Sequence, residues 1–206
     1  MVGEIIKKGV GPVLLLLLIS ACGEIGGSGQ CGGGEGTGSC LRIESITPQY
    51  LEKNRPSVDV VQVDCDASAS TTKLEPMASH SAELVISNRP IPPLTKDDIS
   101  DITLRSYSIS YIVNRCPSGA TCPALDLLLV NPGQTFLVPA DGSVTFTGLD
   151  FFPLDSKNEY LGKFGSTLAF PHYTANYRFT GTDSHQNPVS VEGSSSFEIG
   201  NFDYCD

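Results

Sequence analysis

The chain has 206 residues, of which 13 are Lys or Arg and 23 are Asp or Glu, so its formal net charge is −10 at pH 7. This acidic balance argues against nucleic-acid binding, because contacts with phosphate need clustered Lys and Arg. A charged fraction of 17% argues against a highly charged disordered chain, and 21 Gly and 14 Pro argue against a helical bundle. The length allows one ordinary domain with extensions.

Residues 1–21 are predicted to be a signal peptide. Lys7 and Lys8 precede an apolar run over residues 10–19. About ten apolar residues are too few for a permanent transmembrane helix, which needs about 20, but they suit the core of a secretory signal. The alternative for the following cysteine is an ordinary signal peptide cut nearby, with Cys22 in a disulfide.

The end of the apolar run, Ile19-Ser20-Ala21-Cys22, resembles the lipobox of bacterial lipoproteins. The resemblance implies that a diacylglyceryl group is attached to the Cys22 thiol, that cleavage precedes Cys22, and that the new N-terminus is acylated. Such acyl chains would make membrane residence effectively permanent. Gly23, in place of Asp, implies the bacterial outer membrane by the sorting rule of some Gram-negative bacteria, with the protein facing the periplasm or the cell exterior.

Residues 22–39 are predicted to be the lipidated Cys and a flexible tether, and the domain is expected over 40–206. Nine of the seventeen residues 23–39 are Gly, a composition that cannot bury apolar surface and is costly to order. A coil of this length has an r.m.s. span of about 20–25 Å. A phosphate-binding loop is a poor alternative, because no Gly-Lys-Ser/Thr follows.

Six cysteines remain besides Cys22, and an even number in an exported chain predicts disulfides. Cys116 and Cys122 enclose a short turn-rich loop and are predicted to pair. Cys31 with Cys40 is the expected local pair, which leaves Cys65 with Cys205. The rival pairing joins Cys40 to Cys65 or Cys205 and leaves Cys31 free or bonded elsewhere.

Two segments near the C-terminus predict a long antiparallel hairpin. Apolar and polar residues alternate over 173–180 and 189–199, and the turn-rich stretch 181–188 separates them. A third segment, 102–113, alternates in the same way. Shorter strands are expected at Leu41–Ile46, Val58–Val63, Ala82–Ser87, Leu125–Val130, Thr135–Val138 and Ser143–Leu149. The helix candidates are short, at Thr95–Asp101 and Ser156–Tyr160.

Eight or so strands with turns between them predict an all-β fold, an antiparallel sandwich. The segment Ser106-Tyr107-Ser108-Ile109-Ser110-Tyr111 is similar to a central strand of fibronectin type III-like and other immunoglobulin-like domains. The resemblance implies an immunoglobulin-like β-sandwich with long loops, and it carries over no functional residue. Two features depart from that pattern: the chain has no Trp, and Tyr204 immediately precedes Cys205.

The sequence contains few motifs that are typical of catalytic or binding sites. His80, His172 and His185 have no paired spacing; His80 is expected in a loop and His185 in a solvated turn. Gly-x-Ser-x-Gly is absent, so no catalytic residue is predicted, and neither is a cofactor. Most Tyr and Phe residues are expected to face the core, which disfavours a sugar-binding platform.

One predicted cluster of acidic residues forms only if particular cysteines pair. If Cys65 bonds Cys205, the aspartates near the bridge are weak candidate ligands for Ca²⁺, which takes six to eight oxygens; they are Asp64, Asp66, Asp203 and Asp206. A second oxygen-rich stretch, expected as a loop, holds Asp155, Asn158 and Glu159. Solvated acids and a plain turn are the alternatives.

These observations predict a lipid-anchored cell-envelope protein that acts as a non-catalytic interaction or structural module. Its expected partners are the membrane, reached through the lipid, and another envelope protein or a surface glycan. The first alternative is a carbohydrate-binding surface module, assisted by Ca²⁺ or not. The second is an envelope hydrolase whose active site is assembled from distant residues.

Overall fold

The computed structural model describes residue 31 and residues 38–66, 72–126, 128–130, 135–164 and 170–205. The predicted signal peptide, Cys22 and most of the predicted tether lie outside the described residues.

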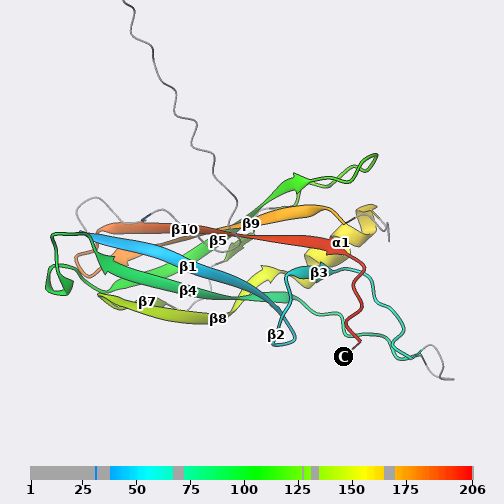
Figure 1. Ribbon diagram of the computed structural model, residues 1–206, viewed down its shortest axis with the longest axis horizontal. Helices are drawn as coiled ribbons and strands as arrows, with labels where there is room; N and C mark the ends of the chain where they lie inside the picture. Colours follow the sequence, from blue (N-terminus) through cyan, green and yellow to red (C-terminus); the bar gives the residue numbers. More distant parts are fainter. Residues whose placement is uncertain are drawn as a thin grey trace, which may run out of the picture.

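The described chain is an all-β sandwich of two sheets (Figure 1). Its strands are β1 (Ser39–Tyr50), β2 (Lys53–Asn54), β3 (Ser57–Asp59), β4 (His80–Pro90), β5 (Ile102–Arg115), β6 (Leu128–Val130), β7 (Phe136–Val138), β8 (Gly142–Phe152), β9 (His172–Asp183) and β10 (Pro188–Gly200). A 3₁₀ turn, η1 (Lys96–Asp98), and an α-helix, α1 (Leu154–Phe164), are the helical elements of these ranges.

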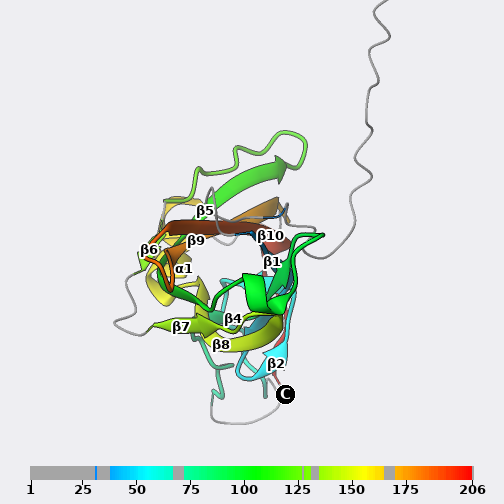
Figure 2. The same cartoon turned by 90° about the vertical axis from the view of Figure 1, so that its left-hand side faces the viewer.

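The two sheets differ in size. The smaller has the order β2-β1-β4-β8, and the larger has the order β3-β10-β9-β5-β6, with β7 also paired to β5. Every pair is antiparallel except β3 with β10, where Ser57–Asp59 runs parallel to Glu198–Gly200. The end-on view shows the two layers facing each other (Figure 2). The predicted antiparallel sandwich is therefore confirmed, with one parallel pair that alternation in the sequence does not signal.

The predicted hairpin is formed by β9 and β10, which pair from Pro188↔Thr182 to Glu198↔His172. Tyr173, Tyr177 and Phe179 are buried, as the alternation predicts, while the polar residues between them line the outer face. On β10, Gly193 stands on the inward face directly across from Ile43 of β1. A Cβ at Gly193 would lie 2.9 Å from the Ile43 Cβ, so glycine allows the two sheets to approach at this point.

In this chain, which has no Trp, the hydroxyl groups of three tyrosines form hydrogen bonds between the two sheets. Tyr107 donates to Asp150 Oδ2 at 3.1 Å and accepts the Asp150 N–H at 3.0 Å. Tyr111 donates to the Phe151 carbonyl at 2.6 Å, and Tyr177 donates to the Asp150 carbonyl. The register between β4 and β8 shifts in this stretch, which removes ladder partners from the β8 backbone. The hydroxyls from the larger sheet therefore satisfy backbone groups that the smaller sheet leaves unpaired.

Two predicted strands are longer than the observed ones. The predicted strand 58–63 is limited to β3, because Asp59 accepts the Val61 N–H through its side chain at 3.4 Å and the chain turns away. The predicted strand 125–130 is limited to β6, Leu128–Val130. Residues 123–126 lie instead beside α1, where the Pro123 carbonyl accepts a hydrogen bond from Tyr173 at 3.1 Å.

The helix predictions were also inexact. The stretch 95–101 forms only η1, closed by Asp98, whose carboxylate accepts the Thr95 N–H at 2.7 Å and the Thr95 hydroxyl at 2.8 Å. The short helix predicted at 156–160 is the longer α1, which begins after Pro153. Its first N–H, that of Leu154, donates to Ser79 Oγ at 3.0 Å. Within the described ranges, no helix has the length and apolar content needed to cross a membrane.

The two ends of the sandwich carry different elements. β1 begins at the end of the sandwich that holds the β9–β10 turn (Figure 1). α1, β2, β3 and the segment after β10 gather at the opposite end, which we call the α1 end. The candidate functional residues lie at the α1 end.

Candidate functional site

Buried polar side chains converge at the α1 end. We call them the α1-end cluster; they are Tyr50, Asp59, Glu75, His80, Lys157 and Tyr204. Tyr50, Asp59 and His80 lie at strand termini, and Lys157 lies on α1. The four charged or basic members are at most 3% exposed. Such groups are expensive to bury unless they are paired or neutral, so their surroundings show which form each takes.

His80 is held as a neutral imidazole. Its Nε2 lies 3.0 Å from the Ser57 carbonyl oxygen, so the proton resides on Nε2. Its ring stacks on Tyr50 with centroids 4.5 Å apart. Burial, and then the charge of Lys157, lower the His80 pKa to about 3. His80 was expected in a loop, but it is the first residue of β4 and is 1% exposed.

Lys157 is completely buried beneath the same aromatic ring. Its Nζ lies 4.6 Å from the centre of the Tyr50 ring, which is cation–π geometry. Nζ has no hydrogen-bond partner among the residues that the structure describes. Burial lowers the Lys157 pKa to about 8, against the opposing effect of the negative charges on Asp59 and Glu75.

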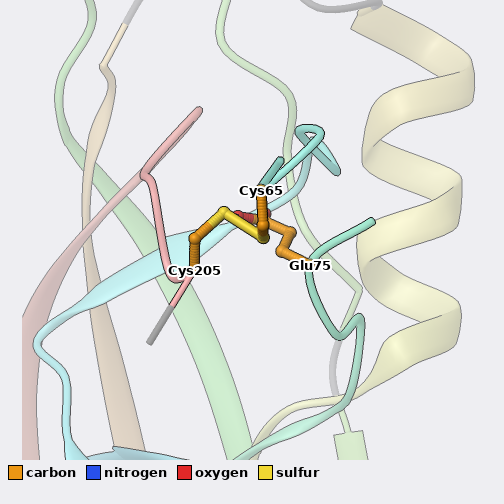
Figure 3. A group of neighbouring side chains, drawn as sticks. All are labelled: Cys65, Glu75 and Cys205. Carbon is orange, nitrogen blue, oxygen red and sulfur yellow. A yellow bond between two sulfur atoms is a disulfide. The ribbon is translucent and has the colours of Figure 1, made fainter. Parts of the chain in front are cut away.

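Glu75 is a buried carboxyl that titrates near neutrality. Burial raises its pKa to about 7, and the neighbouring carboxyl of Asp59 adds to the effect. Its Oε2 accepts the Tyr204 N–H at 3.1 Å. In the described part of the chain, Oε1 has no hydrogen-bond partner. Figure 3 shows its carboxyl group turned toward the Cys65–Cys205 disulfide, and Oε2 lies 3.9 Å from Cys205 Sγ.

The cluster holds the segment after β10. Asp59 Oδ1 accepts the Phe202 N–H at 2.9 Å, and Glu75 accepts the next alternate N–H, that of Tyr204. The Tyr204 hydroxyl donates to the Ser57 carbonyl at 2.8 Å. Two buried carboxyls thus replace the carbonyls of a neighbouring strand for residues 201–205, which form no strand of their own.

The predicted aspartate site is arranged differently from the expectation. Asp64 Oδ1 accepts the N–H groups of Asp66 at 3.1 Å and Lys73 at 3.0 Å. Asp203 Oδ1 accepts the Cys205 N–H at 3.0 Å, and Asp206 lies outside the described residues. Among the described residues, the group of potential ligands brought together here is Cys65, Glu75 and Cys205, whose donor atoms lie within 4.8 Å of one another. Because the two sulfurs are bonded to each other, they cannot also act as thiolate ligands.

The second oxygen-rich stretch is helical, so the prediction of a loop there was wrong. Asp155, Asn158 and Glu159 lie on α1, and Glu159 forms an i,i+4 ion pair with Lys163. This pair lines a small cleft between α1 and residues 123–126. Tyr111 and Tyr160 also line it.

The other histidines lie elsewhere. His185 is in the β9–β10 turn with a side chain that is 77% exposed, as predicted. His172 begins β9, and its Nε2 lies 2.7 Å from Glu198 Oε1 on the outer face of the larger sheet. Most aromatic rings face the core, as expected; among the described residues, Phe170 at 37% is the aromatic ring that is largely exposed.

The cysteines form the expected pairs. Cys31–Cys40, Cys65–Cys205 and Cys116–Cys122 are all at disulfide distance, and the rival pairings of Cys40 are not formed. Cys22, the predicted lipid attachment site, lies outside the described residues.

Sequence reasoning missed the α1-end cluster. Glu75 and Asp59 carry no motif, and their proximity depends on loops that close around the segment after β10. Lys157 did carry a signal: it follows Leu154 and precedes Tyr160 at three-residue spacing, so it falls within the apolar stripe of a helix. A longer helix at this position would have predicted a buried lysine.

Comparison of the sequence with known protein families and with curated proteins finds no match.

Proposed function

We propose that this protein is a lipid-anchored module of the bacterial outer membrane that acts by non-catalytic interaction with another envelope component. The observation that carries the proposal is the use of the seven cysteines. Six are consumed in three disulfides, so Cys22 has no cysteine left in the chain to pair with. This argues against the alternative of a disulfide at Cys22 within one molecule, and it suits a thiol in Ile19-Ser20-Ala21-Cys22 that accepts a lipid.

The arrangement of the sandwich supports an outward-facing role for the α1 end. The segment that follows Cys22 joins the sandwich at the start of β1, where Cys31 is bonded to Cys40. The α1 end lies at the other end of β1, a strand of 12 residues that spans about 40 Å at about 3.3 Å per residue. An anchor at Cys22 is therefore attached at the end of the sandwich opposite α1 and its cleft, which leaves the α1 end accessible to a partner.

The test is acylation in a Gram-negative host. The full chain is expected to incorporate labelled palmitate and to enter the outer-membrane fraction, whereas Cys22→Ser incorporates no label. Cys31→Ser is the matched control, since it removes a cysteine of the same segment and leaves the lipobox intact; it should be labelled like the unchanged protein. Equal labelling of Cys22→Ser would contradict the proposal. Gly23→Asp should stay labelled and move to the inner membrane.

Glycan binding is a second candidate, favoured by the α1 cleft. The cleft combines two tyrosines with Asp126, Glu159 and Lys163. Tyrosine faces and carboxylates are suited to contact the apolar and hydroxyl surfaces of a sugar. A glycan array probed with the full chain and with Asp126→Asn tests this candidate, which requires binding that weakens in the variant.

A further inference from the structure

The Cys65–Cys205 disulfide has chemical surroundings that differ from those of the Cys116–Cys122 disulfide. Both Cys65 and Cys205 are half-buried, and Cys205 Sγ lies 3.9 Å from a carboxyl oxygen of Glu75. Cys116 Sγ instead lies 3.1 Å from the carbonyl oxygen of Ala120, a group that cannot exchange a proton. Of these two disulfides, Cys65–Cys205 is therefore the one with a titratable acid at its sulfur.

Glu75 is equipped for proton transfer to that sulfur. It is 1% exposed, and a hydrogen bond with the Asp59 side chain favours its protonated form. Its Oε2, the oxygen that lies 3.9 Å from Cys205 Sγ, also accepts the N–H of Tyr204, the neighbour of Cys205 in the chain, and this contact holds the carboxyl beside the sulfur. The pKa of about 7 means that the acid and the carboxylate are both populated at neutral pH.

We propose that Cys65–Cys205 is an exchange-active disulfide that oxidises a partner dithiol, with Glu75 as the proton donor to Cys205. Thiol–disulfide exchange proceeds faster when the leaving sulfur is stabilised, and protonation of the departing thiolate provides this. A buried acid beside one sulfur of the pair also decides which sulfur leaves.

The exchange takes place in two steps. A thiolate of the partner dithiol attacks Cys65 Sγ, the Cys65–Cys205 bond breaks, and its electron pair moves to Cys205 Sγ. The protonated Glu75 gives its proton to this sulfur and becomes a carboxylate. The second thiolate of the partner then attacks the partner sulfur of the mixed disulfide, and Cys65 leaves as a thiolate that takes a proton from water. Two electrons pass from the partner to the protein, and Glu75 regains a proton from solvent.

Several charged groups face Glu75 from the elements packed around it. Asp59 of β3 and Asp203 of the segment after β10 raise its pKa, while the Tyr204 backbone N–H lowers it. Lys157 of α1 and the Tyr50 phenol of β1 also interact with Glu75 electrostatically, and Lys157 in turn acts on His80 of β4. Lys157 and His80 are set to titrate at about 8 and about 3. Of these groups, Glu75 is therefore the one that is expected to change its charge between pH 6 and about pH 7.5.

The test uses the full chain in detergent and dithiothreitol as the dithiol. Samples are quenched with iodoacetamide, and peptide mass spectrometry follows each disulfide separately. The measured quantity is the reduction rate of Cys65–Cys205 divided by that of Cys116–Cys122 in the same molecules. The ionisation of dithiothreitol affects both rates equally and cancels. We expect this ratio to fall about fourfold between pH 6 and pH 7.5, because the carboxylate cannot donate a proton. A ratio that does not change with pH overturns the proposal.

A substitution provides the second arm. Glu75→Gln retains an oxygen to accept the Tyr204 N–H but carries no acidic proton. It is expected to lower the rate ratio at pH 6 at least about tenfold and to abolish its pH dependence. Glu159→Gln on α1 is the control and should leave the ratio unchanged. If Glu75→Gln has the same rate ratio and the same pH profile as the unchanged protein, the proposal is overturned as well. If this variant does not fold, the pH profile of the unchanged protein decides.

Discussion

The Lys157 amine lies 4.6 Å from the centre of the Tyr50 ring, and the same ring stacks on His80 with centroids 4.5 Å apart. One aromatic side chain thus separates two basic groups that are both nearly inaccessible to water. Each of them resists protonation in the folded state, so the stability of the sandwich depends on pH in two separate ranges.

Lys157→Met is expected to remove the alkaline part of this dependence. Because the folded pKa of about 8 lies below the ordinary value of 10.5, the unfolded chain binds more protons between these values. Stability therefore rises with pH in that window, by about 3 kcal/mol over its full width. The difference in unfolding free energy between the unchanged protein and Lys157→Met, measured in urea from pH 7 to pH 10, should increase with pH. The tyrosines that ionise near pH 10 are present in both proteins and cancel in the difference.

His80→Gln is expected to remove the pH dependence of stability in the acidic range. The folded pKa of about 3 lies below the ordinary 6.5, so protonation of the unfolded chain destabilises the native state as pH falls from 6.5 toward 3. The raised pKa of Glu75 acts in the opposite direction, because the stability it contributes is lost as pH rises from 4.5 through about 7. Since Glu75 is common to both proteins, the difference between them should follow His80 alone, with a slope of about 1.4 kcal/mol per pH unit between pH 4 and pH 6. Denaturant titrations that give a constant difference would contradict this assignment.

Tyr107→Phe is expected to reduce stability by about 1–3 kcal/mol, because it leaves the Asp150 N–H and carboxylate without the partner that the opposite sheet supplies. Ser106→Ala is the control. The Ser106 hydroxyl bonds Thr180 at 2.8 Å on the exposed outer face, where water can replace it. Its loss should change the unfolding free energy by less than about 0.5 kcal/mol. Equal effects of the two substitutions in thermal unfolding would argue against tyrosine bridging of the sheets.

Two glycine substitutions should have opposite signs. At Gly162 in α1, an added Cβ meets no atom within 4 Å, so Gly162→Ala should stabilise by about 0.5–1 kcal/mol. At Gly181 in β9, a Cβ would lie 2.0 Å from the Thr103 carbonyl oxygen, beside the register shift of β5. Gly181→Ala should therefore destabilise by about 1–3 kcal/mol. Melting temperatures of the pair provide the measurement, and stabilisation by both would contradict the close approach of β5 and β9.

The sequence predicted the parts of this fold that are periodic. Alternation over β9, β10 and β5 located the larger sheet, because one face of each strand is buried along its whole length. The features that the sequence did not predict include the parallel pairing of β3, the early end of the predicted strand at 58–63, and the burial of His80. Each depends on side chains such as Asp59 and Tyr204 that meet only after the chain has folded. Local patterns carry no information on such distant contacts.

The candidate site was predictable only in part, for the same reason. Cysteine counting led to Cys65 and Cys205, and the structure pairs them. The acids expected around them were the sequence neighbours Asp64, Asp66 and Asp203, whereas the acid at the sulfur is Glu75, ten residues beyond Cys65. Sequence neighbours of a half-buried disulfide can turn toward solvent, while a residue from another loop can fill the space beside it.

The short strands at the margins of the larger sheet have a consequence for how copies of this protein behave when crowded together. β3 pairs with only three residues of β10, 198–200, and β6 and β7 pair with only residues 107–109 and 102–104 of β5. Within the described residues, positions 188–197 of β10 therefore pair with β9 on one side and with no strand on the other. Unpaired backbone donors and acceptors along such an edge can pair with the extended chain of a second molecule. The β10 edge is therefore where crowded copies of the sandwich are expected to pair edge to edge.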